Sequence, residues 1–232
     1  HSLDISKYNS VKYLNQGSKI DNLINTFNFV FVGEFVERKN IQALVKAFHM
    51  EFEPDEPVNL YIKTSQQSLD YVQNYFKQIK QGLKLRKEYK EEVVICGQLG
   101  REDYMSTISQ CHSFVMPSRG EGFCIPALEA MAMGIPVIYT EGTGMDDFCS
   151  GSAVKSSEVP CFGAMSTIDY LYTANEKWRK IDLEDLMVSM REVFMKWNTE
   201  IATEESREAL KRASEFSHKE IGLKLKEILN DG

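Results

Sequence analysis

Short apolar runs alternate with longer amphipathic segments along the first two thirds of the chain. The run at residues 29–32 is continuously aromatic or β-branched, which is typical of a strand buried on both faces of a sheet. Residues 39–52 instead carry apolar side chains three and four positions apart, which predicts a helix. The same criteria predict strands at 29–32, 58–62, 92–97, 113–116 and 137–139, a weak strand at 153–155, and helices at 39–52, 68–89, 101–111, 126–133 and 145–149.

Beyond residue 161 the pattern becomes helical, with segments at 183–197, 204–216 and 219–229 that we expect to wrap back over the sheet. Five apolar strands separated by helices predict an α/β fold, a Rossmann-like parallel sheet with helices on both faces. We interpret residues 1–232 as a single domain, with a linker segment at 1–26, a Rossmann-like core at 27–160 and C-terminal helices at 161–232. Ligands of such sheets bind beyond the carboxyl ends of the strands.

Composition excludes several classes of partner. A formal net charge of −7 disfavours a general nucleic-acid surface. The five cysteines lack a C-x-x-C pair and the four histidines share no metal-ligand spacing, so we expect no metal, no cofactor and reduced thiols in the cytoplasm. No apolar run reaches the roughly 18 residues of a membrane span, so no transmembrane segment is expected.

Residues 117–129 carry the most specific chemistry. Pro126 suits the first turn of a helix, where its missing N–H costs nothing. The loop before it would present the N–H groups of Phe123, Cys124 and Ile125 to the end of the sheet, and such an array favours phosphate. Gly122 would let a ligand approach the backbone closely.

Glu121 and Glu129 flank this predicted helix start. Helical side chains tilt toward the N-terminus, so Glu129 would point back toward the loop that carries Glu121, and both could converge on one site. A carboxylate that accepts sugar hydroxyls makes contacts worth about 1.5 to 3 kcal/mol. A glutamate in a first turn is also common because it suits the helix dipole, at about 0.3 to 1 kcal/mol. Spacing alone leaves both readings open.

The stretch 121–138, EGFCIPALEAMAMGIPVI, resembles the E-x7-E signature of the retaining family 4 glycosyltransferases. Residues 31–33 with the following Arg38-Lys39-Asn40 resemble the first strand and phosphate loop of that family, and residues 1–4 resemble the H-G-V-D segment that opens its C-terminal domain. The similarity runs to about residue 148, and residues 178–191 resemble one subset of the family. The resemblance implies the C-terminal, nucleotide-sugar-binding half of a GT-B fold.

The resemblance also implies a role for individual residues. Glu121 would lie by the donor sugar and Glu129 would bind the ribose hydroxyls. Lys39, with Arg38 in reserve, would contact the diphosphate, so Glu121 and Lys39 are the predicted catalytic residues. The full set of predicted donor-binding residues is Gly33, Arg38, Lys39, Gln98, Leu99, Glu121, Gly122, Phe123, Cys124, Ile125 and Glu129, with Gln98 and Leu99 near the nucleobase.

Three positions depart from the family pattern. Glu34 stands where the family often has arginine, so either Arg38 substitutes for it or Glu34 turns away from the diphosphate. Cys124 replaces the second glycine of E-G-F-G and adds a side chain near the sugar. Asp146 or Asp147 stands for the acid of the family's G-G-x-x-E loop.

The expected function is to hold the donor for a retaining transferase that moves a hexose from a UDP- or GDP-sugar to an acceptor. The chain starts at a linker-like segment, so we expect it to bind donor but to be inactive without an N-terminal acceptor domain. Peripheral membrane association of the full-length enzyme stays open. Two alternatives remain: a non-catalytic scaffold or regulatory domain, which Glu34 and Cys124 would favour, and another GT-B enzyme such as a sugar-nucleotide epimerase.

Overall fold

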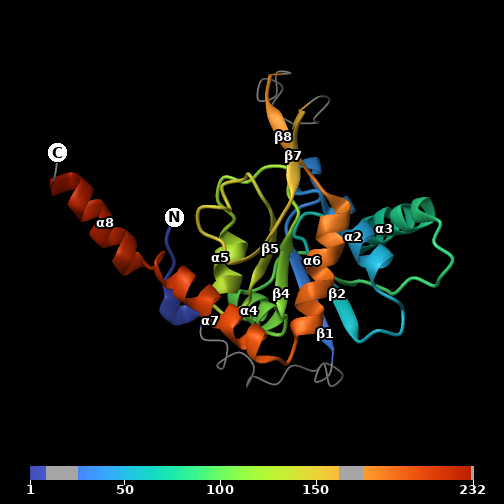
Figure 1. Cartoon of the computed structure of the whole chain (residues 1–232), viewed down its shortest axis with the longest axis horizontal. Coiled ribbons are helices and arrows are strands. Elements are labelled where there is room, and N and C mark those ends of the chain that lie inside the picture. The colour runs from blue at the N-terminus through green and yellow to red at the C-terminus, as the bar shows by residue number, and fades with distance from the viewer. Residues whose placement is uncertain (9–25, 162–174, 231–232) are drawn as a thin grey trace.

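The computed structural model describes residues 1–8, 26–161 and 175–230. Its centre is a six-stranded parallel sheet in the order β3-β2-β1-β4-β5-β6 (Figure 1). These strands are β1 (Phe27–Val32), β2 (Val58–Lys63), β3 (Val93–Ile95), β4 (Ser113–Met116), β5 (Val137–Thr140) and β6 (Gly151–Val154). The order is that of a Rossmann fold, which confirms the predicted fold class.

β1 lies at the middle of the sheet because both of its faces are apolar. Phe29, Val30 and Phe31 are fully buried, and the strand pairs in parallel with β2 on one side and β4 on the other. A strand with no polar face can only be covered on both sides. The core therefore extends from β1 to the helices on either face of the sheet.

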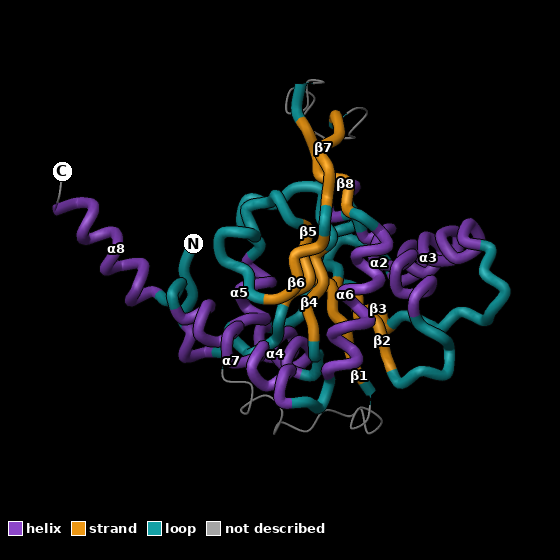
Figure 2. Tube along the Cα trace, in the orientation of Figure 1, coloured by secondary structure: helices purple, strands orange, loops and turns teal. Residues whose placement is uncertain are grey.

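The described residues form seven α-helices and two short 3-10 helices. Most of the α-helices lie around the sheet, whereas α8 projects away from it (Figure 2). The helix α2 packs against α3 and α6, whereas α5 packs against α7. The predicted helices are all present except the one at 145–149, where the chain makes turns. The helices are η1 (Ile5–Lys7), η2 (Glu37–Lys39), α2 (Ile41–Glu51), α3 (Leu69–Leu83), α4 (Arg101–Ser109), α5 (Ile125–Met131), α6 (Leu183–Lys196), α7 (Glu200–Ser214) and α8 (His218–Asn230).

A hairpin that the sequence did not predict rises beyond the sheet (Figure 1). β7 (Ser156–Pro160) pairs in antiparallel fashion with β8 (Lys177–Ile181). β8 falls in the region 161–232 that we expected to be helical, so that part of the interpretation is wrong. Its apolar residues, Trp178 and Ile181, are too few for a strand pattern, and the strand is specified by its pairing with β7.

The first residues of the chain dock on the helical end of the domain. Leu3 is buried and forms a parallel bridge with Ser217, at the start of α8. α8 itself extends away from the body of the molecule (Figure 1), and Leu225, Ile228 and Leu229 on it are exposed. Most of the predicted linker, residues 9–25, and the start of the predicted C-terminal helices, residues 162–174, lie outside the described residues. The division into three segments of one domain stays a prediction.

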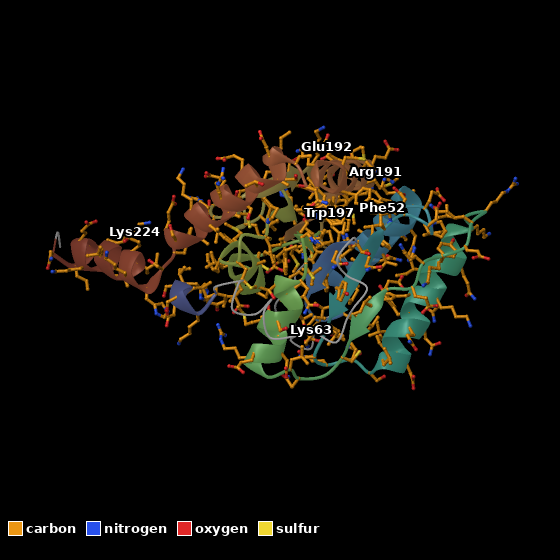
Figure 3. The ribbon with its side chains drawn as sticks, turned by 90° about the horizontal axis from the view of Figure 1, so that it is seen from below. Phe52, Lys63, Arg191, Glu192, Trp197 and Lys224 are labelled. Atoms are coloured by element: carbon orange, nitrogen blue, oxygen red, sulfur yellow. The ribbon has the colours of Figure 1, made fainter. Side chains whose placement is uncertain are left out.

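Arg191 on α6 fastens the helices of one face together. Its guanidinium donates hydrogen bonds to the side chain and the carbonyl of Glu51 (both 2.7 Å) and to the carboxylate of Glu56. It also lies 4.4 Å from the centre of the Phe52 ring, and Figure 3 shows the two side chains next to each other. α6 is thereby fixed to the end of α2.

Candidate functional site

The site lies where the carboxyl ends of β1 and β4 meet. Because the strand order reverses between these two strands, their loops diverge and leave room for a ligand. Two hydrogen bonds hold the loops in register: the amide of Arg119 donates to the carbonyl of Arg38 (2.7 Å), and Asn40 Nδ2 donates to the carbonyl of Pro117 (3.1 Å). The predicted site residues of both loops are therefore neighbours.

Glu121 brings the two predicted diphosphate ligands together. Lys39 Nζ lies 2.7 Å and Arg38 Nη1 2.8 Å from the same Oε1 atom of Glu121, whose side chain is only 6% exposed. Arg38 also donates to the carbonyl of Gly120 (2.6 Å). Gly33 lies beside this cluster, since a Cβ there would stand 3.6 Å from Lys39 Cδ. Two cations against one carboxylate leave this partly exposed cluster with a net positive charge.

The loop after Glu121 is braced from behind. The amide of Gly144 donates to the carbonyl of Glu121 (2.8 Å), and the ring of Phe123 stacks on Phe148 at 4.3 Å. Asp146 accepts a hydrogen bond from the amide of Gly142 (2.7 Å), so its carboxylate caps its own loop. The predicted phosphate-binding amides are thus held on a rigid support.

The helix that follows this loop, α5, begins after Cys124 without a side-chain cap. The first amides of such a helix attract phosphate. α5 has only seven residues, so its dipole is short and adds little to this attraction. Ile125, at the helix start, is exposed.

Cys124 is buried among the apolar side chains of the core. Burial raises the pKa of its thiol to about 11, so the thiol stays protonated near neutral pH. A protonated, buried thiol is a poor nucleophile. Cys124 can therefore take part in the site through its backbone but not through thiolate chemistry.

Glu34, the acid that stands where the family often has arginine, faces away from Lys39. Its carboxylate accepts hydrogen bonds from Thr64 Oγ1 (2.9 Å) and from the amides of Ser65 (3.1 Å) and Gln66 (3.0 Å). We expected either that Glu34 turns away from the diphosphate or that Arg38 substitutes for the family's arginine. The structure has both arrangements, because Arg38 also pairs with Glu121. Glu34 thus organises the loop after β2.

Glu129 belongs to a second cluster. Tyr8 donates a hydrogen bond to its Oε1 atom (2.8 Å) and Tyr104 to its Oε2 atom (3.0 Å), and Arg101 Nη1 lies 3.7 Å from Oε1. Glu121 and Glu129 thus have different partners, although we expected them to converge. Each carboxylate is fixed separately, one by the β1 loop and the other by α4 and the N-terminal segment.

Gln98 and Leu99 follow β3, which β2 separates from β1. The buried ammonium of Lys63 donates to the carbonyl of Gly97 (2.7 Å) and to Ser65 Oγ (3.1 Å). Burial lowers the pKa of Lys63 from its ordinary value. Lys63 therefore joins the loop after β2, where Glu34 is anchored, to the loop predicted to meet the nucleobase.

The sequence did not reveal Tyr8, Tyr104, Arg101 or Lys63 as site residues. Their contacts join distant segments, and a lysine that ends an apolar strand gives no local signal. Among the residues the structure describes, no group of three histidines, cysteines or acids could hold a metal ion. In the same residues no helix is long and apolar enough to cross a membrane.

Comparison with known proteins identifies the family. Residues 26–159 match the model of the glycosyl transferases group 1, which is more than half of the chain. The chain belongs to this family. The matched range contains every residue of the Glu121 cluster and, apart from Tyr8, every residue of the Glu129 cluster.

Relatives of this group 1 glycosyltransferase domain include the serotype-specific mannosyltransferase WbdA of Escherichia coli, 28% identical over 116 residues, which are 47% of this chain and 13% of that protein. The uncharacterized glycosyltransferase 335 of Sulfolobus islandicus rod-shaped virus 1 is 27% identical over 175 residues, 70% of this chain and 45% of that protein. The chain thus spans less than half the length of either relative.

Solved structures share the fold at low identity. A glycosyltransferase from Rickettsia africae superposes on all of this chain and on 55% of its own, with a TM-score of 0.72 and 16% identity. Anabaena Alr3699/HepE, solved in complex with UDP and glucose, superposes on all of this chain and on 56% of its own, with a TM-score of 0.62 and 17% identity. These neighbours are GT-B glycosyltransferases, and the chain has the fold of one domain of such enzymes.

Proposed function

We propose that this chain is the donor-binding domain of a retaining glycosyltransferase that transfers a hexose from a UDP- or GDP-sugar. The observation that carries the proposal is the cluster of Lys39 and Arg38 around the buried carboxylate of Glu121 at the reversal point of the sheet. The name of WbdA, a mannosyltransferase, and the UDP and glucose in the Anabaena structure support a hexose and a nucleoside diphosphate.

The cluster suggests how the donor is held. In the free protein Glu121 neutralises part of the charge of Lys39 and Arg38 and keeps both side chains in place. A diphosphate that enters would attract the two cations, and Glu121 would then accept a hydrogen bond from a hydroxyl of the sugar. The same cations would stabilise the charge that develops on the leaving diphosphate. This chemistry needs neither a metal ion nor another cofactor.

A second domain would supply the acceptor, so we propose that this chain alone binds donor without transferring sugar. Sustained transfer by the isolated chain would contradict that part of the proposal.

All five cysteines are free thiols, in agreement with the reducing, cytoplasmic setting that we expect for the enzyme.

Calorimetric titration of UDP, GDP and their hexose conjugates into this chain tests the proposal. We expect saturable binding with one of the two nucleotides. One observation favours a different function: Glu121 is already paired with both cations and is almost fully buried, as a non-catalytic scaffold would allow. Absence of binding with every donor would support the scaffold and overturn the transferase.

Replacement of Lys39 should weaken diphosphate binding. Lys39→Ala is expected to cost about 1.5 to 3 kcal/mol of UDP or GDP affinity, because a charge-assisted contact is lost. The free energy of unfolding should change little, since Arg38 still pairs with Glu121. Lys46→Ala is the matched control, because Lys46 lies on α2 and is not one of the two cations that contact Glu121. Parent-like affinity in both Lys39→Ala and Arg38→Ala would remove the two cations from the site.

The two glutamates should respond differently to loss of charge. Glu129→Gln is expected to weaken free nucleoside diphosphate and intact donor alike, by about 1 to 3 kcal/mol, because ribose is common to both. Glu121→Gln should weaken the sugar-bearing donor but not the free nucleoside diphosphate, because the diphosphate no longer competes with a carboxylate for Lys39 and Arg38. Isotherms of both variants with both ligands measure this. If Glu129→Gln binds the nucleoside diphosphate as the parent does, the carboxylate of Glu129 supports the fold and does not bind ribose.

A further inference from the structure

The carboxylate of Glu129 is oriented by three side chains from two other segments. Tyr8, which follows η1, donates to Oε1 at 2.8 Å, and Tyr104 of α4 donates to Oε2 at 3.0 Å. Arg101, also on α4, lies 3.7 Å from Oε1. Rotation of the carboxylate about its terminal bond is therefore restrained, because each oxygen has its own hydroxyl donor.

The hydroxyl of Tyr8 is itself directed. Arg101 Nη2 donates a hydrogen bond to Tyr8 Oη, so the proton of that hydroxyl is left to point at Glu129. Burial, and then the charge of Glu129, raises the pKa of Tyr8 to about 12. Burial also raises the pKa of Tyr104 far above its ordinary value. Both phenols therefore remain protonated and act as donors across the ordinary pH range.

Each carboxylate oxygen of Glu129 keeps a lone-pair position that the tyrosines do not use. An ionised carboxylate offers about four lone-pair positions, two on each oxygen. One position on Oε1 is used by Tyr8 and one on Oε2 by Tyr104, so each oxygen keeps one. The side chain is 11% exposed, and a ligand would have to approach it through that opening. Two acceptors on neighbouring oxygens match the two hydroxyls of a vicinal diol, as in ribose.

We propose that Tyr8 and Tyr104 are positioning residues that fix Glu129 as a two-point acceptor for the 2′- and 3′-hydroxyls of a ribonucleotide. The tyrosines thereby set the preference of the site for ribose over 2′-deoxyribose. This inference rests on the proposed function, in which Glu129 binds ribose. It adds that the N-terminal segment is part of the donor site through Tyr8, although the matched family range begins only at residue 26.

The test compares ribose discrimination rather than affinity alone. UDP, 2′-deoxy-UDP, GDP and 2′-deoxy-GDP are titrated into the parent chain and into Tyr8→Phe, Tyr104→Phe, the double variant and Glu129→Gln. Tyr61→Phe is the control, because Tyr61 is also buried but lies on β2. For the nucleotide that binds, the parent should prefer the ribo form by roughly 10- to 150-fold. Each single tyrosine variant should lose at least a factor of about 3 of this ratio.

The double variant should approach the ratio of Glu129→Gln, and Tyr61→Phe should keep that of the parent. A merely structural role would lower affinity for both forms equally and leave the ratio unchanged, which would overturn the inference. If Glu129→Gln also keeps the parent ratio, the ribose assignment in the proposed function is wrong, and so is the inference. Absence of all binding to the parent contradicts the proposed function itself. Thermal unfolding identifies variants that do not fold, and where one tyrosine variant fails the other decides.

Discussion

Glu92→Gln is expected to lower the free energy of unfolding by about 3 kcal/mol. Glu92 accepts hydrogen bonds from His49 Nε2 (2.6 Å) and Lys80 Nζ (2.9 Å), and its side chain is 4% exposed. Removal of one partner of a buried ion pair typically costs about 3 to 5 kcal/mol, since the other charge is left without a partner. Lys80 is 16% exposed and can partly hydrate, which places the effect at the lower end. Urea denaturation measures it.

The matched control is Glu208→Gln, the same substitution at an exposed i,i+3 pair with Lys211 on α7. That pair should contribute between about 0 and 1 kcal/mol. If both variants unfold at the same urea concentration, the buried network does not stabilise the fold as we argue.

The pKa of Glu92 determines how the stability of the same network depends on pH. Burial acts to raise the pKa of Glu92, but the hydrogen bonds and charges of His49 and Lys80 outweigh it, so the folded pKa lies below the ordinary value of 4.5. A group with a lowered folded pKa stabilises the fold above its unfolded pKa, and that contribution is lost as pH falls through the folded pKa. The parent should therefore lose stability below about pH 4.5, more steeply than Glu92→Gln.

The central sheet could be predicted because its strands need no long-range information. Three of the four residues at 113–116 are apolar and a proline follows them, and β4 (Ser113–Met116) has those limits. β8 had no such signal, since three of its five residues, Lys177, Arg179 and Lys180, are basic. It is a strand because of β7, about twenty residues earlier, and single-segment patterns do not contain that pairing.

The site was predictable to the extent that its chemistry is local. The signature loop was predicted from residue spacing and resemblance and Lys39 from resemblance alone, and the structure brings Lys39 and Glu121 together. The partner of Glu129 was not found, because Tyr8 lies 121 positions away in the chain. The tilt of helical side chains suggested that Glu129 points toward Glu121, but side chains of α4 compete for the same carboxylate. Tilt alone does not decide between nearby partners.

Gly144→Ala is expected to disturb both folding and donor binding. A Cβ at this position would stand 2.1 Å from the carbonyl oxygen of Gly122 and 2.9 Å from that of Glu121, and both are backbone atoms that no rotamer change can move. The two loops must separate, which should lower the free energy of unfolding by about 1 to 3 kcal/mol. The hydrogen bond from the Gly144 amide to Glu121 would be strained by the same shift. Displacement of the loop amides should reduce nucleoside diphosphate affinity by roughly tenfold.

Gly82→Ala is the control, because a Cβ at Gly82 meets nothing within 4 Å and the residue lies inside α3. An added methyl group there should stabilise the fold by about 0.5 to 1 kcal/mol, without effect on binding. Thermal unfolding measures the effect on stability, and titration with UDP or GDP measures the effect on affinity. A Gly144→Ala variant with parent-like stability and parent-like affinity would mean that the loop after β5 does not brace the loop of Glu121. Lost stability with retained affinity would mean that this contact stabilises the fold but does not position the loop amides that bind phosphate.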